Sequence, residues 1–218
     1  MPPPPLRIFL AGATGFIGRE VARLGRAAGH RIVGLSPAGR PALEEPWVEG
    51  IEWLTGDAAE PGDWDDALAK SDVIIDVMSR RGSEAKGGAE PTGRLFDNAR
   101  RARVGRFVHV TAAADFPGAS DDYLTSCRRR EQELIESTDA DAPRLVIVRL
   151  PPVYGAGRPG SLAALPLLRL AGRDHRCKPI PVGQAAMAIL RASIEPDHEG
   201  IIDCPEAVDL GNAVMLQS

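Results

Sequence analysis

The chain has 218 residues, of which 44% are hydrophobic and 26% are charged, and its formal net charge is −4 at pH 7. This length suits one folded domain with a sizeable buried core. The mildly acidic charge gives no electrostatic argument for nucleic acid as a partner, because proteins that bind nucleic acid usually present a basic face.

Membrane, metal and disulfide signals are weak in this sequence. The apolar run at residues 8–11 breaks into glycines, far short of the roughly 20 residues that a membrane-spanning helix needs. Cys127, Cys177 and Cys204 lie far apart without the spacing of metal ligands, and the four histidines add no zinc signature. We therefore expect no signal peptide, no membrane partner, no metal, and reduced thiols in a cytoplasmic protein.

Short apolar runs alternate with amphipathic stretches, which predicts βαβ units and a parallel sheet. In chain order we predict strands at 7–11, 31–35, 51–54, 73–77, 106–110, 145–149 and 200–203. Helices are predicted at 16–28, 64–69, 92–103, 123–136, 161–171 and 184–192, and a mobile glycine-rich loop at 79–90. Together they predict an α/β fold: a doubly wound parallel sheet of the Rossmann type in three α/β/α layers. Residues 1–218 would form one domain, with a small substrate-side region from about residue 156.

The strongest local motif joins the first predicted strand to the first predicted helix, and it reads Gly12-Ala13-Thr14-Gly15-Phe16-Ile17-Gly18. Glycines let the backbone turn tightly and approach a pyrophosphate without an intervening side chain. The helix that begins here presents unpaired N–H groups and the positive end of its dipole. Because the turn lies between a strand and a helix, the motif predicts a dinucleotide site. The alternative is a plain connector.

The end of the second predicted strand bears on which nicotinamide nucleotide binds. Domains that prefer NAD usually place an Asp or Glu there to hold the ribose hydroxyls. Residues 35–40 contain no acid, whereas Ser36 and Arg40 can both hydrogen-bond a phosphate, and Arg19 could reach the same corner. This pattern favours NADP(H), with NAD(H) as the alternative if Arg40 is only a solvated loop residue.

These motifs resemble the short-chain dehydrogenase/reductase superfamily, in its atypical, epimerase/dehydratase-like branch. That branch includes relatives of nucleotide-sugar epimerases and of a complex I accessory subunit. The resemblance runs from about Arg7 to Gly155 and more weakly to Gly200. It implies that the glycine turn holds the pyrophosphate and that further residues line the cofactor: Asp57 and Ala58 at the adenine, Val77 and Met78 alongside, and Pro151 and Val153 by their backbone at the nicotinamide.

The chemistry of this superfamily lies in a Y-x-x-x-K motif, whose tyrosine is the general acid or base and whose lysine lowers the tyrosine pKa. The resemblance assigns the tyrosine role to Tyr123 and the hydroxyl at the end of the fifth strand to Thr111. Cys127 stands at the lysine position, and a neutral thiol supplies neither charge nor strong donors. Arg128 is rotated away from Tyr123 on an ideal helix.

Two functions therefore stay open at this point. One is an NADP(H)-dependent oxidoreductase or epimerase-like enzyme that acts on a small carbonyl, quinone or sugar-like substrate. The other is a dinucleotide-binding redox sensor, regulator or assembly factor without turnover, which Cys127 favours. Helices around the tyrosine often pair in this superfamily, so the resemblance also implies a homodimer.

Overall fold

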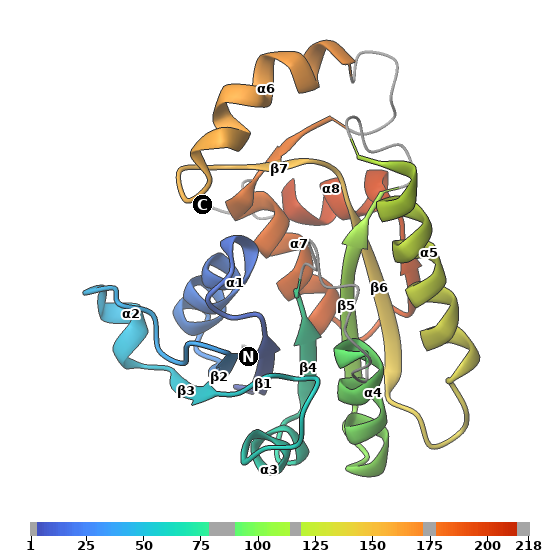
Figure 1. Ribbon diagram of the computed structural model, residues 1–218. Helices are drawn as coiled ribbons and strands as arrows, with labels where there is room; N and C mark the ends of the chain where they lie inside the picture. Colours follow the sequence, from blue (N-terminus) through green and yellow to red (C-terminus); the bar gives the residue numbers. More distant parts are fainter. Residues whose placement is uncertain (1–3, 79–89, 114–118, 172–177, 213–218) are drawn as a thin grey trace.

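One sheet of seven parallel strands organises the computed structural model (Figure 1). The structure describes residues 4–78, 90–113, 119–171 and 178–212. Within them the strand order is β3-β2-β1-β4-β5-β6-β9. The strands are β1 (Arg7–Ala11), β2 (Arg31–Ser36), β3 (Glu52–Thr55), β4 (Val73–Asp76), β5 (Arg106–Ala112), β6 (Arg144–Leu150) and β9 (Gly200–Ile202).

Helices cover both faces of this sheet. One face carries α1 (Phe16–Ala27), α7 (Val182–Ile194) and α8 (Cys204–Asn212), and the other carries α3 (Trp64–Ala69), α4 (Pro91–Arg101) and α5 (Asp121–Glu136). Short α2 (Pro46–Glu49) lies between β2 and β3 in the chain. Helix α6 (Pro159–Ala171) and the two-stranded pair of β7 (Val153–Tyr154) and β8 (Ile180–Pro181) lie beyond the sheet.

The alternation of side chains along each strand explains why the sheet is covered on both sides. Ile8 and Leu10 of β1 pack in the core under α1 and α7, whereas Phe9 of the same strand packs in the core under α3 and α4. Strands buried on both faces read as continuous apolar runs, as these do. The doubly wound, three-layer fold that the sequence predicts is therefore confirmed.

The predicted elements differ from the observed ones mostly at their ends. Strand β5 extends to Ala112, and α5 begins two residues before Tyr123, at Asp121. Four elements that are short or poorly periodic were not predicted from the sequence: α2, β7, β8 and α8. The loop predicted at 79–90 lies outside the described residues, apart from Glu90, which caps α4.

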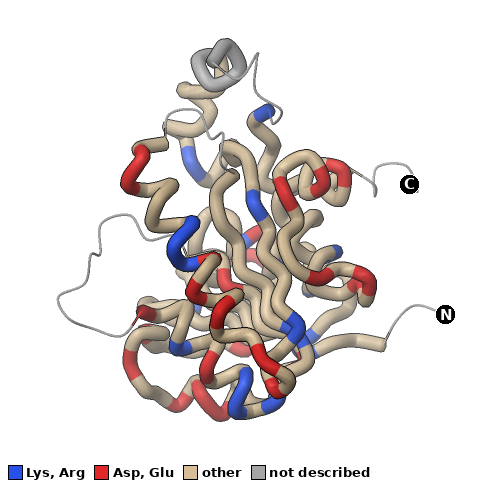
Figure 2. Tube along the Cα trace, turned by 90° about the vertical axis from the view of Figure 1, so that its right-hand side faces the viewer, with Lys and Arg blue, Asp and Glu red and all other residues tan. Residues whose placement is uncertain are grey.

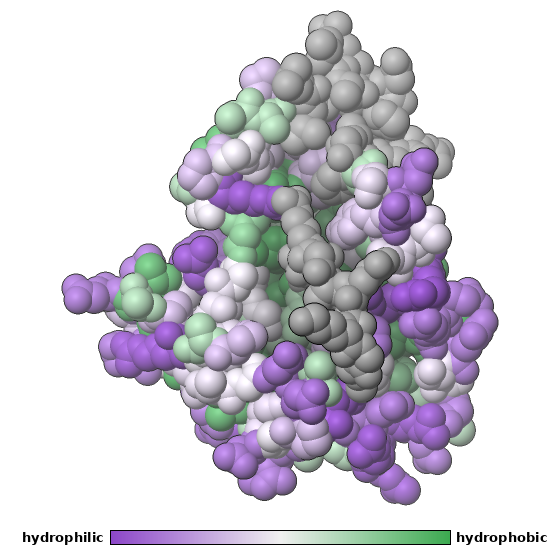
Figure 3. Space-filling model, viewed as in Figure 1, coloured by the Kyte–Doolittle hydropathy of each residue, from purple (hydrophilic) through white to green (hydrophobic). Residues whose placement is uncertain are grey.

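The carboxyl ends of the parallel strands share one edge of the sheet, and the chain order reverses there between β1 and β4. Open α/β sheets bind ligands at such a switch point. Helix α6 stands above this edge in Figure 1. In the space-filling view (Figure 3), the surface is hollowed below α6, and the visible floor of the hollow is coloured as apolar.

Seen from the side of α5, the described residues carry acidic and basic positions interspersed over the helices (Figure 2). None of the helices that the structure describes is both long and apolar enough to cross a bilayer.

Candidate functional site at the carboxyl edge

The turn after β1 is closed directly onto α1. The Gly12 carbonyl accepts a 2.9 Å hydrogen bond from the Gly15 amide, and Gly12 has a φ of +84°, a conformation that glycine adopts most readily. A Cβ on Gly18 would lie 2.1 Å from the Gly12 carbonyl oxygen. Any side chain at position 18 would therefore force the turn and the helix apart.

The N-terminus of α1 presents its amides without a competing side chain. Gly15 is the N-cap, no side chain caps the helix, and its first turn holds no acidic residue. The first turn of a helix has N–H groups without intrahelical partners, and the helix dipole favours an anion there. A pyrophosphate fits this turn, which is the condition for a bound dinucleotide.

Segments far apart in the chain form the surroundings of the turn. Met78 packs against it from the end of β4, since a Cβ on Gly12 would lie 3.2 Å from its amide nitrogen. Phe16 lies beside Gly155, with its Cζ 3.3 Å from where a Cβ would stand. Pro151 is buried, whereas Val77 and Val153 are partly exposed. The structure thus brings the predicted nicotinamide-side segment to the glycine turn.

At the end of β2, both predicted phosphate-binding side chains already have partners. The buried Ser36 hydroxyl donates a 2.9 Å hydrogen bond to the Gly39 carbonyl, and Arg40 forms an exposed ion pair with Glu49. Arg19 lies next to the loop before α6, with a guanidinium nitrogen 3.8 Å from the Cβ position of Gly157.

The residues predicted at the adenine follow β3. Asp57 is exposed, and its carboxylate accepts a 2.9 Å hydrogen bond from the Ala59 amide, whereas Ala58 is buried. The carboxylate therefore stabilises its own turn in this structure.

The predicted catalytic side chains lie on β5 and α5. Thr111 is 8% exposed, and its buried hydroxyl oxygen has no hydrogen-bond partner within the described part of the chain. Tyr123 is in the first turn of α5 and is partly exposed, and Cys127 is a free, buried cysteine one turn further on. A buried hydroxyl without a partner is costly in a protein interior, so Thr111 is a natural contact for a ligand.

Arg128 of the same helix reaches the end of β5. Its guanidinium donates to the Ala112 carbonyl, at the carboxyl end of β5 and next to Thr111. The long side chain therefore reaches back over the sheet edge instead of into solvent. A cation therefore lies near the end of β5, although cysteine and not lysine stands four residues after Tyr123.

A buried carboxylate holds this cation in place. Glu131 is 2% exposed and pairs with Arg128 and, at 2.6 Å, with Arg149 of β6. The hydrogen bond that Arg149 donates to the Glu131 carboxylate raises the pKa of Arg149 above its ordinary value. The sequence analysis missed Glu131, because an i, i+3 charge pair is also typical of a solvated helix face.

A second buried carboxylate, Asp76, also escaped the sequence analysis. It ends β4, is fully buried, and accepts hydrogen bonds from Thr92 and His109 at 2.7 and 2.9 Å. Burial opposes the ionisation of Asp76. The hydrogen bond and the charge of His109, together with the hydrogen bonds from Thr92 and the Met78 amide, nevertheless hold the Asp76 pKa below its ordinary value. The sequence signal that could have found Asp76 is that it is the single acid in the apolar strand Val73–Asp76.

The sequence profile of the NAD(P)H-binding family matches residues 12–149, which include both the glycine turn and the β5–α5 region. The chain belongs to the NAD(P)H-binding family. The resemblance to the atypical, epimerase-like short-chain dehydrogenases/reductases is thereby confirmed at the level of family and fold.

Relatives of this NAD(P)H-binding protein include two curated proteins. An uncharacterised chloroplastic protein of Arabidopsis thaliana is 25% identical over 89% of this chain and 74% of its own length. A ceramide reductase of Caulobacter vibrioides is 30% identical over 77% of this chain, a match that spans only 51% of the reductase.

Among solved structures, the UDP-glucose 4-epimerase of Thermus thermophilus in complex with NAD has the same fold. It superposes with a TM-score of 0.65 at 16% identity, over 98% of this chain and 84% of the epimerase.

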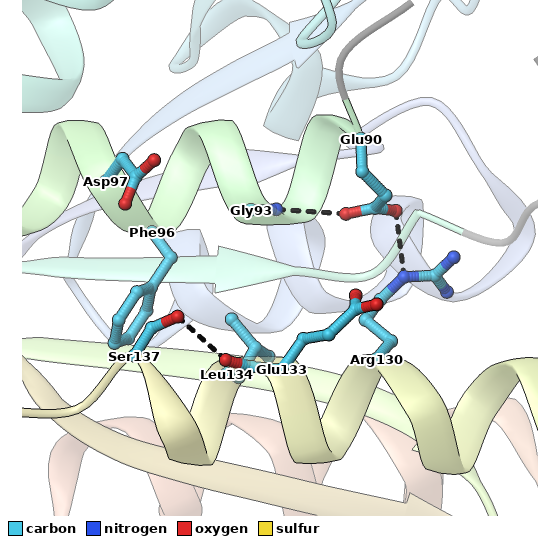
Figure 4. A pocket seen from close by; sticks show the side chains of 8 residues that line it. All are labelled: Glu90, Gly93, Phe96, Asp97, Arg130, Glu133, Leu134 and Ser137. Atoms are coloured by element: carbon cyan, nitrogen blue, oxygen red, sulfur yellow. Dashed lines mark hydrogen bonds and ion pairs between the residues drawn. The ribbon is translucent and has the colours of Figure 1, made fainter.

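One pocket in the described part of the chain lies in a groove between α4 and α5 (Figure 4). Glu90 accepts from the Gly93 amide at the start of α4 and pairs with Arg130 across the groove at 2.8 Å. Glu133 and Asp97 also line it. Because the ion pair closes one end of the groove, we read it as a helix contact and place the functional site at the glycine turn.

The cysteines depart from the prediction in one respect. Cys127 is a free thiol, but Cys204 takes part in a disulfide, so the expectation of reduced thiols is wrong for Cys204. Within the residues that the structure describes, no group of three or more histidine, cysteine or acidic side chains is arranged to hold a metal ion.

Proposed function

We propose that this protein is an NADP(H)-dependent oxidoreductase of the atypical short-chain dehydrogenase/reductase type. Its substrate would be a small carbonyl, quinone or sugar-like compound held at the carboxyl ends of β4, β5 and β6. The observation that supports this most directly is the buried Thr111 hydroxyl, which has no partner within the described residues and sits at the end of β5.

The roles of the chain's own residues follow from their placement. A reduced nicotinamide dinucleotide held by the glycine turn would supply the chemistry of hydride transfer to a substrate carbonyl. Thr111 donates a hydrogen bond to the carbonyl oxygen of the substrate, and Tyr123 gives this oxygen a proton. The tyrosinate that results then takes up a proton from water. The guanidinium of Arg128, which lies at the Ala112 carbonyl, is the positive charge that this proposal assigns to the phenol, because a neighbouring cation favours loss of the phenol proton.

The preference for NADP(H) is supported by the end of β2. Residues 35–40 contain no acid that could hold the ribose hydroxyls, as domains that prefer NAD usually do. Arg40 pairs with Glu49, and the two side chains are 49% and 70% exposed. Exposed ion pairs contribute little, so a phosphate can take the place of Glu49 at small cost.

The test is NADPH oxidation against a panel of aldehydes, quinones, nucleotide sugars and long-chain ketones. The last class enters because one relative is a ceramide reductase. We expect turnover with at least one class, and a loss of about 100-fold or more in kcat/KM for Tyr123→Phe, since a positioned general acid contributes roughly that much. An unchanged NADPH affinity in the variant would show that the site still binds cofactor.

A second function is favoured by one observation: the buried thiol of Cys127 at the position where the superfamily carries lysine. In this case the protein binds the dinucleotide as a redox sensor, regulator or assembly factor. Micromolar NADPH binding without turnover on the whole panel would support it. A gain of activity in Cys127→Lys would instead show that the rest of a catalytic site is intact.

A further inference from the structure

The carboxylate of Asp76 joins three separate elements at the end of β4. Its two oxygens accept from the Thr92 hydroxyl of α4 at 2.7 Å, from His109 Nδ1 of β5 at 2.9 Å and from the Met78 amide at 3.0 Å. Asp76 is 0% exposed. A buried charge is tolerated only with such partners.

One of these partners, Met78, packs against the glycine turn. Asp76 pairs in register with Ala11, the last residue before the glycines, and the Val77 amide donates to the Ala11 carbonyl at 3.1 Å. A Cβ on Gly12 would stand 3.2 Å from the Met78 amide nitrogen and 3.3 Å from its Cα. The backbone of Met78 is therefore a wall of the turn, and the Asp76 carboxylate fixes that wall.

Stability alone does not require this carboxylate. Its strand neighbours Ile74 and Ile75 are fully buried and apolar. Replacing a buried ion pair by well-packed apolar side chains is often neutral or stabilising. What an apolar residue cannot do is accept a hydrogen bond from the Met78 amide.

We infer that Asp76 is a positioning residue for the dinucleotide: it holds the Met78 amide so that the end of β4 supports the glycine turn in the shape that a pyrophosphate needs. Thr92 and His109 hold Asp76 itself and contribute to the stability of the fold. The inference rests on dinucleotide binding by this chain, but not on any turnover.

Four variants separate these roles. Asp76→Leu removes all three contacts, and Asp76→Asn keeps an oxygen for the Met78 amide. Thr92→Val removes only the contact with α4, and His109→Phe removes only the contact with β5. For each, the Kd for NADPH is measured by calorimetry, and the melting temperature is measured by circular dichroism.

We expect Asp76→Leu to bind NADPH about tenfold or more weakly, and Asp76→Asn to stay within about threefold of wild type. Thr92→Val and His109→Phe should lower the melting temperature and leave the Kd within about threefold. The double variant Asp76→Leu, His109→Leu places an apolar pair in the core. It should recover stability and still bind NADPH about tenfold more weakly, which also covers the case in which Asp76→Leu alone does not fold.

Wild-type affinity in the folded double variant would overturn the inference. So would losses of affinity in Thr92→Val and His109→Phe as large as in Asp76→Leu, because affinity would then follow stability. If wild type binds neither NADPH nor NADH at millimolar concentration, dinucleotide binding fails and this inference fails with it. Binding by wild type with unchanged variants overturns the role of Asp76 alone.

Discussion

At the β1–α1 end of the carboxyl edge the candidate site is made of main chain, whereas at the β5–α5 end it is made of side chains. The turn of Gly12 and Gly18 leaves no room for a Cβ and offers helix amides. Beside β5, by contrast, Glu131 gathers Arg128 and Arg149 around one buried carboxylate.

This difference separates two kinds of requirement. The cofactor end depends on the absence of side chains from the glycine turn. Any residue other than glycine at position 18 would therefore change the geometry of this turn. The chemical end depends on charges that balance one another, so removing the Glu131 carboxylate leaves Arg128 and Arg149 less well compensated, although Arg149 keeps a 3.8 Å pair with Asp203. We therefore expect substitutions at the cofactor end to weaken NADPH binding and substitutions at the chemical end to lower stability.

The largest expected effect is on stability, at Glu131. Glu131→Gln leaves two partly buried arginines without their carboxylate, and we expect a loss of about 3 kcal/mol in the free energy of unfolding in urea. NADPH affinity in the folded fraction should stay near wild type, because the glycine turn is untouched. Glu133→Gln is the matched control: its pair with Arg129 has side-chain exposures of 55% and 71%, and it should change stability by less than about 0.5 kcal/mol. Equal losses in the two variants would contradict the role of Glu131.

The next effect is on binding, at Gly18. The Cβ of Gly18→Ala would lie 2.1 Å from a backbone oxygen that cannot move aside alone. We expect NADPH affinity to fall by about 100-fold, or about 2.7 kcal/mol, as measured by calorimetry. Gly160→Ala, whose Cβ would have no heavy atom within 4 Å, should bind as wild type does. Tight binding by Gly18→Ala would mean that the phosphates lie elsewhere.

The same contrast explains how much the sequence predicts. The sheet and the glycine turn follow from local patterns: apolar runs for strands such as Arg7–Ala11, and glycines placed between a strand and a helix. A main-chain site can be predicted from the sequence, because the spacing of glycines indicates where the backbone must turn. The fold class and the family therefore came out correctly.

The chemical end is less readable, because its contacts join residues distant in the chain. Arg128 reaches Ala112 from the following helix, and Glu131 of that helix pairs with Arg149 of β6. The same difficulty applies to Asp76, which meets His109 on the adjacent strand β5. An ideal helix places Arg128 away from Tyr123, and the length of the arginine side chain is what lets it reach Ala112 at the end of β5. Nothing in local spacing distinguishes a buried Glu131 from an exposed Glu133.

A smaller effect concerns the acidity of Tyr123. The chain has two tyrosines, so Tyr154→Phe leaves Tyr123 as the only phenol, whose ionisation can be followed by ultraviolet absorbance. Removing a nearby cation raises the pKa of a phenol, ordinarily about 10. We expect Arg128→Gln in this background to raise the Tyr123 pKa by about half a unit to one unit.

The control for this titration is Arg129→Gln, which removes the same charge from a side chain that is 71% exposed. It should leave the phenol unchanged, because solvent screens the exposed charge. If Arg128→Gln also leaves the Tyr123 pKa unchanged, the charge of Arg128 only neutralises Glu131 and does not lower the pKa of the phenol. The non-catalytic function would then gain support.

The smallest expected effect discriminates between the two cofactors, at Arg40. Arg40→Gln should weaken NADPH binding about fivefold, close to 1 kcal/mol, and leave NADH binding unchanged, because only NADPH carries the 2′-phosphate. Glu49→Gln releases Arg40 from its ion pair and should have the opposite sign, with tighter NADPH binding and again no change for NADH. Opposite shifts in the ratio of the two Kd values identify competition between a phosphate and the Glu49 carboxylate for one guanidinium. Parallel shifts for both nucleotides would place Arg40 outside the phosphate pocket and remove the argument for NADP(H).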